Sequence, residues 1–259
     1  DPRFSWILKG KKRDIAQTAY QLQVAAKQEN LDGTGQKIWD TGKVDSSQSV
    51  NIVYGGDDLE TGKTYYWRAR VWDQNGEAGR WSKTAYFHVG PMDNSDWKGE
   101  WIGPSDTTIN SPLMRREFNL NKPVREAYVY IVGLGYYELY LNGNKVGDHV
   151  LDPGTTEYNK RALYATYNVT DHLNRDNNAV GVWLGKGYFK HRTTKRYGDR
   201  PQLLFQLLIR HNDGSITRII SDEDWKISES PIVENSIYDG EIYDARIEKP
   251  GWNTFGFND

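Results

Sequence analysis

Carboxylates offer the strongest candidate chemistry in this sequence, in a segment near its C-terminal end. Asp239, Glu241 and Asp244 fall within six residues, and an extended strand would place Asp239, Glu241 and Tyr243 on one face. Two carboxylates held roughly 5–10 Å apart can cleave a glycosidic bond, and carboxylate oxygens also bind Ca²⁺. In the alternative, Asp244 pairs with Arg246 or another Arg in a solvated loop. The segment is therefore a solvated loop, a sugar or interface contact, or a metal or catalytic site.

Aromatic and charged side chains gather in a second polar segment, between residues 188 and 200. Its candidate contact residues are Tyr188, Arg192, Arg196, Tyr197, Asp199 and Arg200. Aromatic faces and planar guanidinium donors suit the C–H face and the hydroxyls of a sugar ring. Tyr and Arg are also enriched at protein interfaces. We expect loops 188–200 and 239–246 to form one ligand-binding or interdomain surface, with a plain solvated loop as the remaining alternative.

Other kinds of catalytic and metal site lack support in the sequence. The five His residues form no H-x-x-x-H or H-x-H pair, and the absence of Cys excludes disulfides, Cys-ligated zinc and thiol catalysis. No Gly-x-Ser-x-Gly elbow and no phosphate-binding loop occurs. We expect none of these sites here, and we assign no catalytic residue, no metal ligand and no cofactor to this stretch.

Composition limits the class of protein and its partners. The 259 residues include 10 Trp and 17 Tyr, which is too aromatic for a disordered chain. No run of about 18 apolar residues could span a membrane. A net charge of −2 provides no basic field for nucleic acid or an anionic membrane, so we expect neither as a partner. The start at Asp1-Pro2-Arg3 leads us to expect a processed or excised piece, and we favour a secreted or periplasmic location.

Strand patterns dominate the first third of the chain. Residues 64–73 alternate so that Tyr65, Trp67, Ala69 and Val71 would line one face. Two shorter strand patterns occupy residues 20–25 and 84–89, and the Asn75-Gly76 pair is a hairpin-turn signal. Short strands at this spacing indicate an antiparallel β-sandwich of about 90 residues.

The polar stretch 90–96, which contains Gly and Pro, is the best boundary between domains. It predicts one domain over residues 1–91 and a second over residues 92–259. Strand patterns of the second region cover residues 127–133, 136–141, 178–184, 203–209 and 217–220. No segment keeps a period of 3.6 residues, so the whole chain is predicted to be all-β.

Several motifs occur together in the second region, in residues 133–148, 197–201, 221–226 and 238–246. In this combination the region resembles the N-terminal domain of bacterial α-L-rhamnosidases of glycoside hydrolase family 78. Residues 65–73 (Tyr-Tyr-Trp-Arg-Ala-Arg-Val-Trp-Asp) are similar to the fibronectin-III-like module that precedes that domain in these enzymes. The resemblance implies a fibronectin-III-like sandwich followed by a jelly-roll sandwich of the galactose-binding-like type.

The resemblance also implies that this stretch is not itself an enzyme. Family members catalyse on a later (α/α)₆ barrel with an acidic general acid and general base. The expected role is therefore to scaffold that downstream catalytic domain of the same polypeptide, with rhamnose-containing glycans as a further contact. Some relatives bind rhamnose through a module that holds calcium, but this chain shows no clear match to that ligand set. A free-standing carbohydrate-binding protein and an adhesion or assembly module remain the alternatives.

Overall fold

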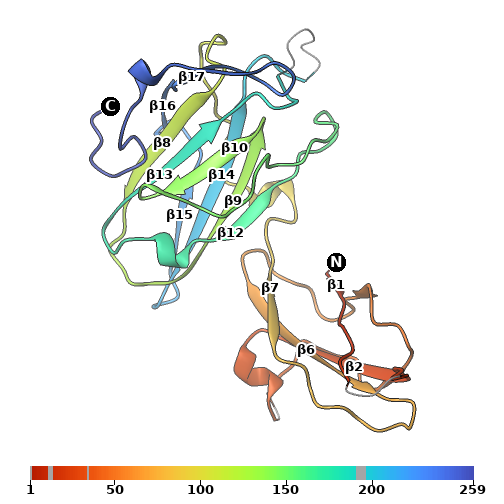
Figure 1. Cartoon of the computed structure of the whole chain (residues 1–259). Helices are drawn as coiled ribbons and strands as arrows, with labels where there is room; N and C mark the ends of the chain where they lie inside the picture. Colours follow the sequence, from red (N-terminus) through yellow and green to blue (C-terminus); the bar gives the residue numbers. More distant parts are fainter. Residues whose placement is uncertain (1, 11–13, 34, 191–196) are drawn as a thin grey trace. The chain divides into compact units, whose positions relative to one another are not determined.

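The computed structural model describes residues 2–10, 14–33, 35–190 and 197–259, and the chain divides into two compact units (Figure 1). Unit 1 is Asp1–Met92 and unit 2 is Asp93–Asp259. Antiparallel strands build both units, which confirms the predicted all-β class. The described helices are short 3₁₀ turns: η1 (Gln28–Leu31), η2 (Asn94–Asp96), η3 (Thr170–His172) and η4 (Ala245–Ile247). Among the described residues, no helix has the length and apolar character needed to cross a membrane.

Unit 1 is a small sandwich of one main sheet and one strand pair. Its strands are β1 (Arg3–Phe4), β2 (Ala19–Ala25), β3 (Trp39–Asp40), β4 (Val44–Asp45), β5 (Ile52–Val53), β6 (Thr64–Trp72) and β7 (Ala85–His88). The main sheet has the order β3-β2-β6-β7 with β4 also paired to β2, and β1 pairs with β5. The core between them includes Phe4, Leu22, Ile52 and Tyr65. The predicted inward face of β6 is confirmed, because Tyr65 and Ala69 are buried.

The outer face of β2 is not solvated as its alternating pattern suggests. Gln21 and Gln23 are buried because polar partners cover both amides. Their Nε2 atoms donate to the Asp40 carboxylate at 2.6 and 2.7 Å. Their Oε1 atoms accept from Nε of Arg70 and of Arg68, respectively, at 3.0 and 3.1 Å. The side chains of β6 therefore cover the polar positions of β2.

Stacked cations and indole rings complete this outer face. The guanidinium carbons of Arg68 and Arg70 lie 4.4 and 4.7 Å from the ring centre of Trp81. Arg70 also lies 5.0 Å from the ring of Trp72, whose other neighbour is Lys43 at 5.6 Å. Each separation is within cation–π range. We call these five side chains the cation–π ladder.

Unit 2 is a larger sandwich of two facing sheets and one separate hairpin. Its strands are β8 (Pro112–Asn119), β9 (Val124–Leu134), β10 (Tyr137–Leu141), β11 (Asn144–Lys145), β12 (Ala165–Asn168), β13 (Asn177–Leu184), β14 (Gln202–His211), β15 (Ile216–Ile220), β16 (Lys226–Glu229), β17 (Ile232–Ser236) and β18 (Gly240–Tyr243). One sheet has the order β11-β10-β13-β8-β16 and the other β12-β9-β14-β15, while β17 pairs with β18. Fully buried residues such as Ile131, Leu139, Val182 and Phe205 fill the space between the sheets.

Consecutive strands β9 and β10 belong to different sheets, so the chain must cross the core edge between them. Gly135 makes this crossing with φ of +120°, a conformation that L-residues rarely adopt. A Cβ atom at Gly135 would also collide with the carbonyl oxygen of Gly185. The crossing therefore requires glycine on conformational and steric grounds.

The last residues of the chain cover the outer face of the five-stranded sheet. The ring of Trp252 packs over Gly181, where an added Cβ would lie 2.7 Å from that ring, and stands 5.7 Å from the ring of Tyr140. The buried Arg115 of β8 donates from Nη1 to the Asp259 carboxylate at 2.5 Å. This segment leaves only part of the sheet face open.

Candidate functional site

The hairpin β17–β18 carries one of the two predicted polar segments. Asp239 lies in its turn rather than on β18, because Ser236 Oγ donates to the Asp239 carboxylate at 3.0 Å and accepts the backbone N–H of Asp239 at 3.1 Å. Glu241 and Tyr243 both belong to β18 and share one face, as predicted. The hairpin exposes large apolar side chains, among them Tyr238 at 69% and Ile242 at 61%.

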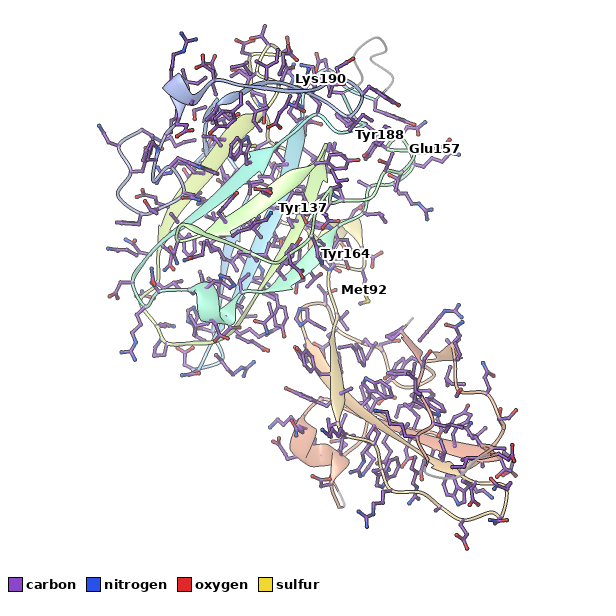
Figure 2. All side chains as sticks on the ribbon, in the orientation of Figure 1. Met92, Tyr137, Glu157, Tyr164, Tyr188 and Lys190 are labelled. Atoms are coloured by element: carbon purple, nitrogen blue, oxygen red, sulfur yellow. The ribbon has the colours of Figure 1, made fainter. Side chains whose placement is uncertain are left out.

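Contacts tie the start of the other predicted segment to this hairpin. The rings of Tyr188 and Tyr238 meet edge to face with centres 6.4 Å apart. Lys186 donates its backbone N–H to Asn235 Oδ1 at 2.8 Å, and its Nζ lies 2.7 Å from Glu234. Figure 2 places Tyr188 and Lys190 at the same end of unit 2. The structure therefore brings together Tyr188, Asp239 and Glu241 of the predicted surface.

Other predicted residues have contacts elsewhere in unit 2. The ring of Tyr197 stands 5.2 Å from that of Tyr158. Arg200 donates from Nε to Asp199 at 3.1 Å and from Nη1 to the carbonyl of Pro104 at 3.1 Å. Arg192 and Arg196 lie outside the described residues. The second predicted segment is therefore divided between two places. Tyr188 contacts the hairpin, whereas Tyr197 contacts Tyr158 and Arg200 contacts Pro104.

Asp244 and Arg246 form the local pair that the solvated-loop interpretation requires. The Asp244 carboxylate accepts from the backbone N, the Nε and the Nη2 of Arg246 at 3.1, 2.8 and 2.6 Å. These hydrogen bonds hold the pKa of Asp244 below its usual value. Both charges are satisfied at the start of η4, so this pair needs no ligand.

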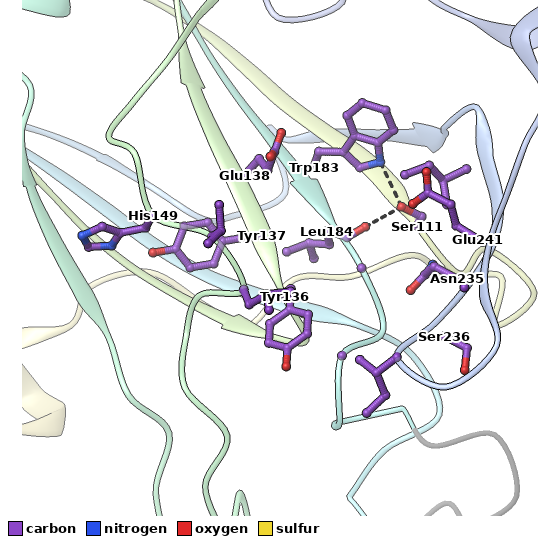
Figure 3. Close-up of a pocket in the computed structure, with 17 residues that line it drawn as sticks. Ser111, Tyr136, Tyr137, Glu138, His149, Trp183, Leu184, Asn235, Ser236 and Glu241 are labelled. Carbon is purple, nitrogen blue, oxygen red and sulfur yellow. Dashed lines mark hydrogen bonds between the residues drawn. The ribbon is translucent and has the colours of Figure 1, made fainter.

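A groove of about 540 Å³ opens beside the hairpin, on the part of the five-stranded sheet that the C-terminal segment leaves free (Figure 3). Its apolar lining includes Tyr136, Tyr137, Val150, Leu151, Trp183 and Ile237. The indole Nε1 of Trp183 donates to Ser111 Oγ at 2.9 Å, and that hydroxyl donates to the carbonyl of Leu184 at 2.7 Å. These bonds fix the indole ring at the groove.

Two carboxylates also line the groove, but one is already engaged. Glu138 accepts from Tyr140 Oη at 2.5 Å and from Lys145 Nζ at 2.6 Å. Burial alone would raise the pKa of Glu138, but these bonds outweigh it and hold the pKa below its usual value. Glu138 is therefore kept as an anion, whereas a glycosidase acid must hold a proton. Glu241 is the second carboxylate of the lining.

Comparison with known families decides what unit 2 is. The family model of the α-L-rhamnosidase N-terminal domain matches residues 122–259. The chain belongs to the α-L-rhamnosidase N-terminal domain family. Residues 1–93 match the model of the Rha78A-like N-terminal immunoglobulin domain, so the module described there is immunoglobulin-like. The predicted resemblance of the second region to this family is confirmed.

Relatives with this N-terminal domain are much longer than the chain. An α-L-rhamnosidase from Formosa agariphila is 38% identical over 100% of the chain, which spans 31% of that protein. The solved α-L-rhamnosidases from Dictyoglumus thermophilum and Aspergillus terreus are 41% and 34% identical, with TM-scores of 0.90 and 0.87. They cover 98% and 99% of the chain, which spans 30% of each.

A hydrogen-bonded cluster holds the loop that forms one wall of the groove in this rhamnosidase N-terminal domain. Asp152 Oδ2 accepts from Tyr137 Oη at 3.1 Å and from Tyr167 Oη at 3.2 Å, and lies 3.0 Å from His149 Nδ1. Burial, and then the hydrogen bond with Tyr167, raise the pKa of Tyr137 well above its usual value. Tyr137 therefore stays a neutral donor, and loop 148–153 is anchored to the sheet.

Sequence reasoning missed the groove itself. Val150 and Leu151 lie on a loop, Trp183 is the last residue but one of β13, and Ile237 lies in a hairpin turn. These residues come from distant segments and share no motif, so only the folded register brings them together. Across residues 2–10, 14–33, 35–190 and 197–259, no three acidic or His side chains are grouped so that they could hold a metal ion.

Proposed function

We propose that this chain is the non-catalytic N-terminal part of an α-L-rhamnosidase and supports a catalytic domain in the same polypeptide. The observation that carries the proposal is the coverage of its relatives. Similarity extends over 98–100% of this chain but only 30–31% of each of three α-L-rhamnosidases. The substrate of the whole protein would then be an α-L-rhamnoside.

The exposed hairpin of unit 2 supports the scaffolding role. Tyr238, Ile242 and Tyr243 are 69%, 61% and 48% exposed at one end of the domain. Burying a large apolar side chain is worth about 1.5–3 kcal/mol relative to exposure. Contiguous exposed apolar groups are typical of interaction surfaces. A catalytic domain that covers the hairpin would recover this free energy.

The states of the acidic residues support a role without catalysis. Glu138 is held as an anion by Lys145 and Tyr140, and Asp244 is bound by Arg246. A retaining or inverting glycosidase needs one protonated carboxyl group in addition to an ionised one. Neither of these two carboxylates supplies that acid, so we expect the 259-residue chain alone to be inactive.

Three proteins made from the complete reading frame test the proposal: the whole product, residues 1–259 alone, and the remainder without them. Hydrolysis of an aryl α-L-rhamnoside and thermal melting are measured for each. We expect turnover from the whole product, none from residues 1–259, and a lowered melting temperature or loss of soluble protein for the remainder. Turnover by residues 1–259, or a remainder that melts and works like the whole product, would overturn the proposal.

A further inference from the structure

We infer that the groove of unit 2 between loop 148–153 and the β17–β18 hairpin docks an apolar side chain of the downstream polypeptide, flanked by a basic residue. This inference rests on the proposed function and adds which surface is covered and by what chemistry. The first support is exposure on both walls: Val150 and Leu151 are 79% and 70% exposed on one side, and Ile237 is 37% exposed on the other. Such rims around a concave apolar site mark binding grooves.

The loop wall is built to present its apolar tip. Leu151 has φ of +56°, a left-handed conformation that is uncommon for a leucine. The adjacent Asp152 fixes the loop through Tyr137, Tyr167 and His149. Residues in such conformations persist where the surroundings enforce them, and they cluster at functional sites. A wall fixed before binding also lowers the entropic cost of docking.

The charge of the groove specifies the flanking group. Its lining contains Glu138 and Glu241 and, among the described residues, no Lys or Arg. The negative charge of Glu138 is balanced by its ion pair with Lys145. Lys186 and Lys190 line the adjoining hollow with Glu241, but Lys186 pairs with Glu234 and Lys190 donates to Asn110 and to the Thr107 carbonyl. An incoming Lys or Arg would therefore complement the Glu241 carboxylate.

The polar groups of the groove favour a side chain over a sugar. Ser111 is engaged by Trp183 and Leu184, and Asn235 accepts from the backbone N–H of Lys186 and donates to the carbonyl of Asn110 at 3.3 Å. A sugar site needs polar groups that converge on the ligand hydroxyls. Here Ser111 and Asn235 are bonded within the domain, and apart from the Glu241 carboxylate the surface of the groove is mainly apolar. The chain outside this stretch supplies the occupant, since the relatives are about three times as long.

Two isoleucines of unit 2 provide a matched test in the full-length protein. Ile237 lines the groove and Ile216 lies on β15, and their exposed fractions are 37% and 38%. Ile237→Cys and Ile216→Cys are each labelled with a maleimide, and the label at each site is quantified by peptide mass spectrometry. Because residues 1–259 contain no Cys, the introduced thiol is the only one in its peptide. We expect labelling of Ile237→Cys to be at least ~10-fold slower than that of Ile216→Cys.

Two further measurements distinguish docking from a difference in the intrinsic reactivity of the two thiols. Ile237→Ser should lower the melting temperature of the full-length protein more than Ile216→Ser, and Glu241→Arg should speed the labelling of Ile237→Cys. Equal labelling rates would overturn the inference while the scaffolding role could still hold, because the remainder deprived of residues 1–259 tests that role separately. Protection of Ile237→Cys by added L-rhamnose would overturn it in favour of a sugar site.

Discussion

The two units cover the faces of their sheets in different ways. Unit 1 covers the outer face of β2 and β6 with its own side chains, through the buried glutamines and the cation–π ladder. Unit 2 covers the outer face of its five-stranded sheet with the C-terminal segment around Trp252, and leaves the groove beside Trp183 open. The difference teaches that two sandwiches of the same all-β class complete the outer face of a sheet by different means.

The largest effect should come from removing core volume in unit 2. Phe205 is fully buried and packs edge to face on Trp225, with ring centres 5.2 Å apart. Phe205→Ala should lower the free energy of unfolding by about 3–5 kcal/mol, the usual cost of deleting a buried aromatic ring. Urea unfolding followed by circular dichroism measures it. Ile216→Ala, on the exposed strand edge, is the control and should cost less than about 1 kcal/mol.

The cation–π ladder of unit 1 should contribute less than a core residue. Trp81→Ala removes the ring that stacks with Arg68 and Arg70, and should cost about 1–2 kcal/mol in urea unfolding. Trp81→Phe keeps a smaller aromatic face and should lose part of this amount. A cost equal to that of Phe205→Ala would break the comparison, because the outer face of unit 1 would then act as a second core.

Acid should weaken unit 1 through Asp40. Burial alone would raise the pKa of Asp40, but hydrogen bonds from Gln21, Gln23 and Gly42 outweigh it and hold the pKa below the usual 3.8. As the pH falls, Asp40 therefore becomes protonated in the unfolded chain before it becomes protonated in the folded protein. The stability that Asp40 confers is complete above that usual value and is lost as the pH falls through the lower folded value. Asp40→Asn should flatten the acid limb of a melting-temperature scan, and superimposable scans would contradict the assignment.

The smallest effect should come from the ion pair at the start of η4. The Arg246 side chain is 88% exposed, so water and salt screen its attraction to Asp244. Arg246→Ala should leave the urea midpoint of the 259-residue chain unchanged within error. A clear shift would show that the pair holds β18 in place and belongs with the structural contacts of the domain. Asp244→Ala should weaken the full-length protein more than the chain alone.

Alternation of apolar and polar residues was sufficient to predict a strand that has one apolar face. β6 has its predicted face inward, and the strand patterns predicted at residues 203–209 and 217–220 correspond to β14 and β15. β8 escaped prediction because it carries Arg115 and Arg116 in its middle. Arg115 pairs there with Glu117, two residues along the strand, and with Asp259, which reaches it only through the fold from more than 140 residues later. No local pattern contains that information.

The candidate site was predictable only in part, for a related reason. Composition grouped Tyr188 with Asp239 and Glu241, and in the structure the Tyr188 ring contacts Tyr238 of the hairpin that carries both carboxylates. Tyr197 and Arg200 lie close to Tyr188 in the sequence, so composition placed them in the same group. In the structure Tyr197 contacts Tyr158 and Arg200 contacts Pro104 instead. Which of these residues share a surface depends on contacts between segments that are distant in the sequence.

The glycine crossing between the two sheets of unit 2 has a consequence for how this gene can vary. Every single-base missense change of a glycine codon encodes a residue that carries a Cβ atom. At Gly135 each such change would meet the carbonyl oxygen of Gly185 and an unfavourable φ of +120° together. Exposed positions such as Val150 on the groove wall have no comparable steric limit. Mutation can therefore reshape the rim of the groove step by step, while the crossing behind it admits no one-step alternative.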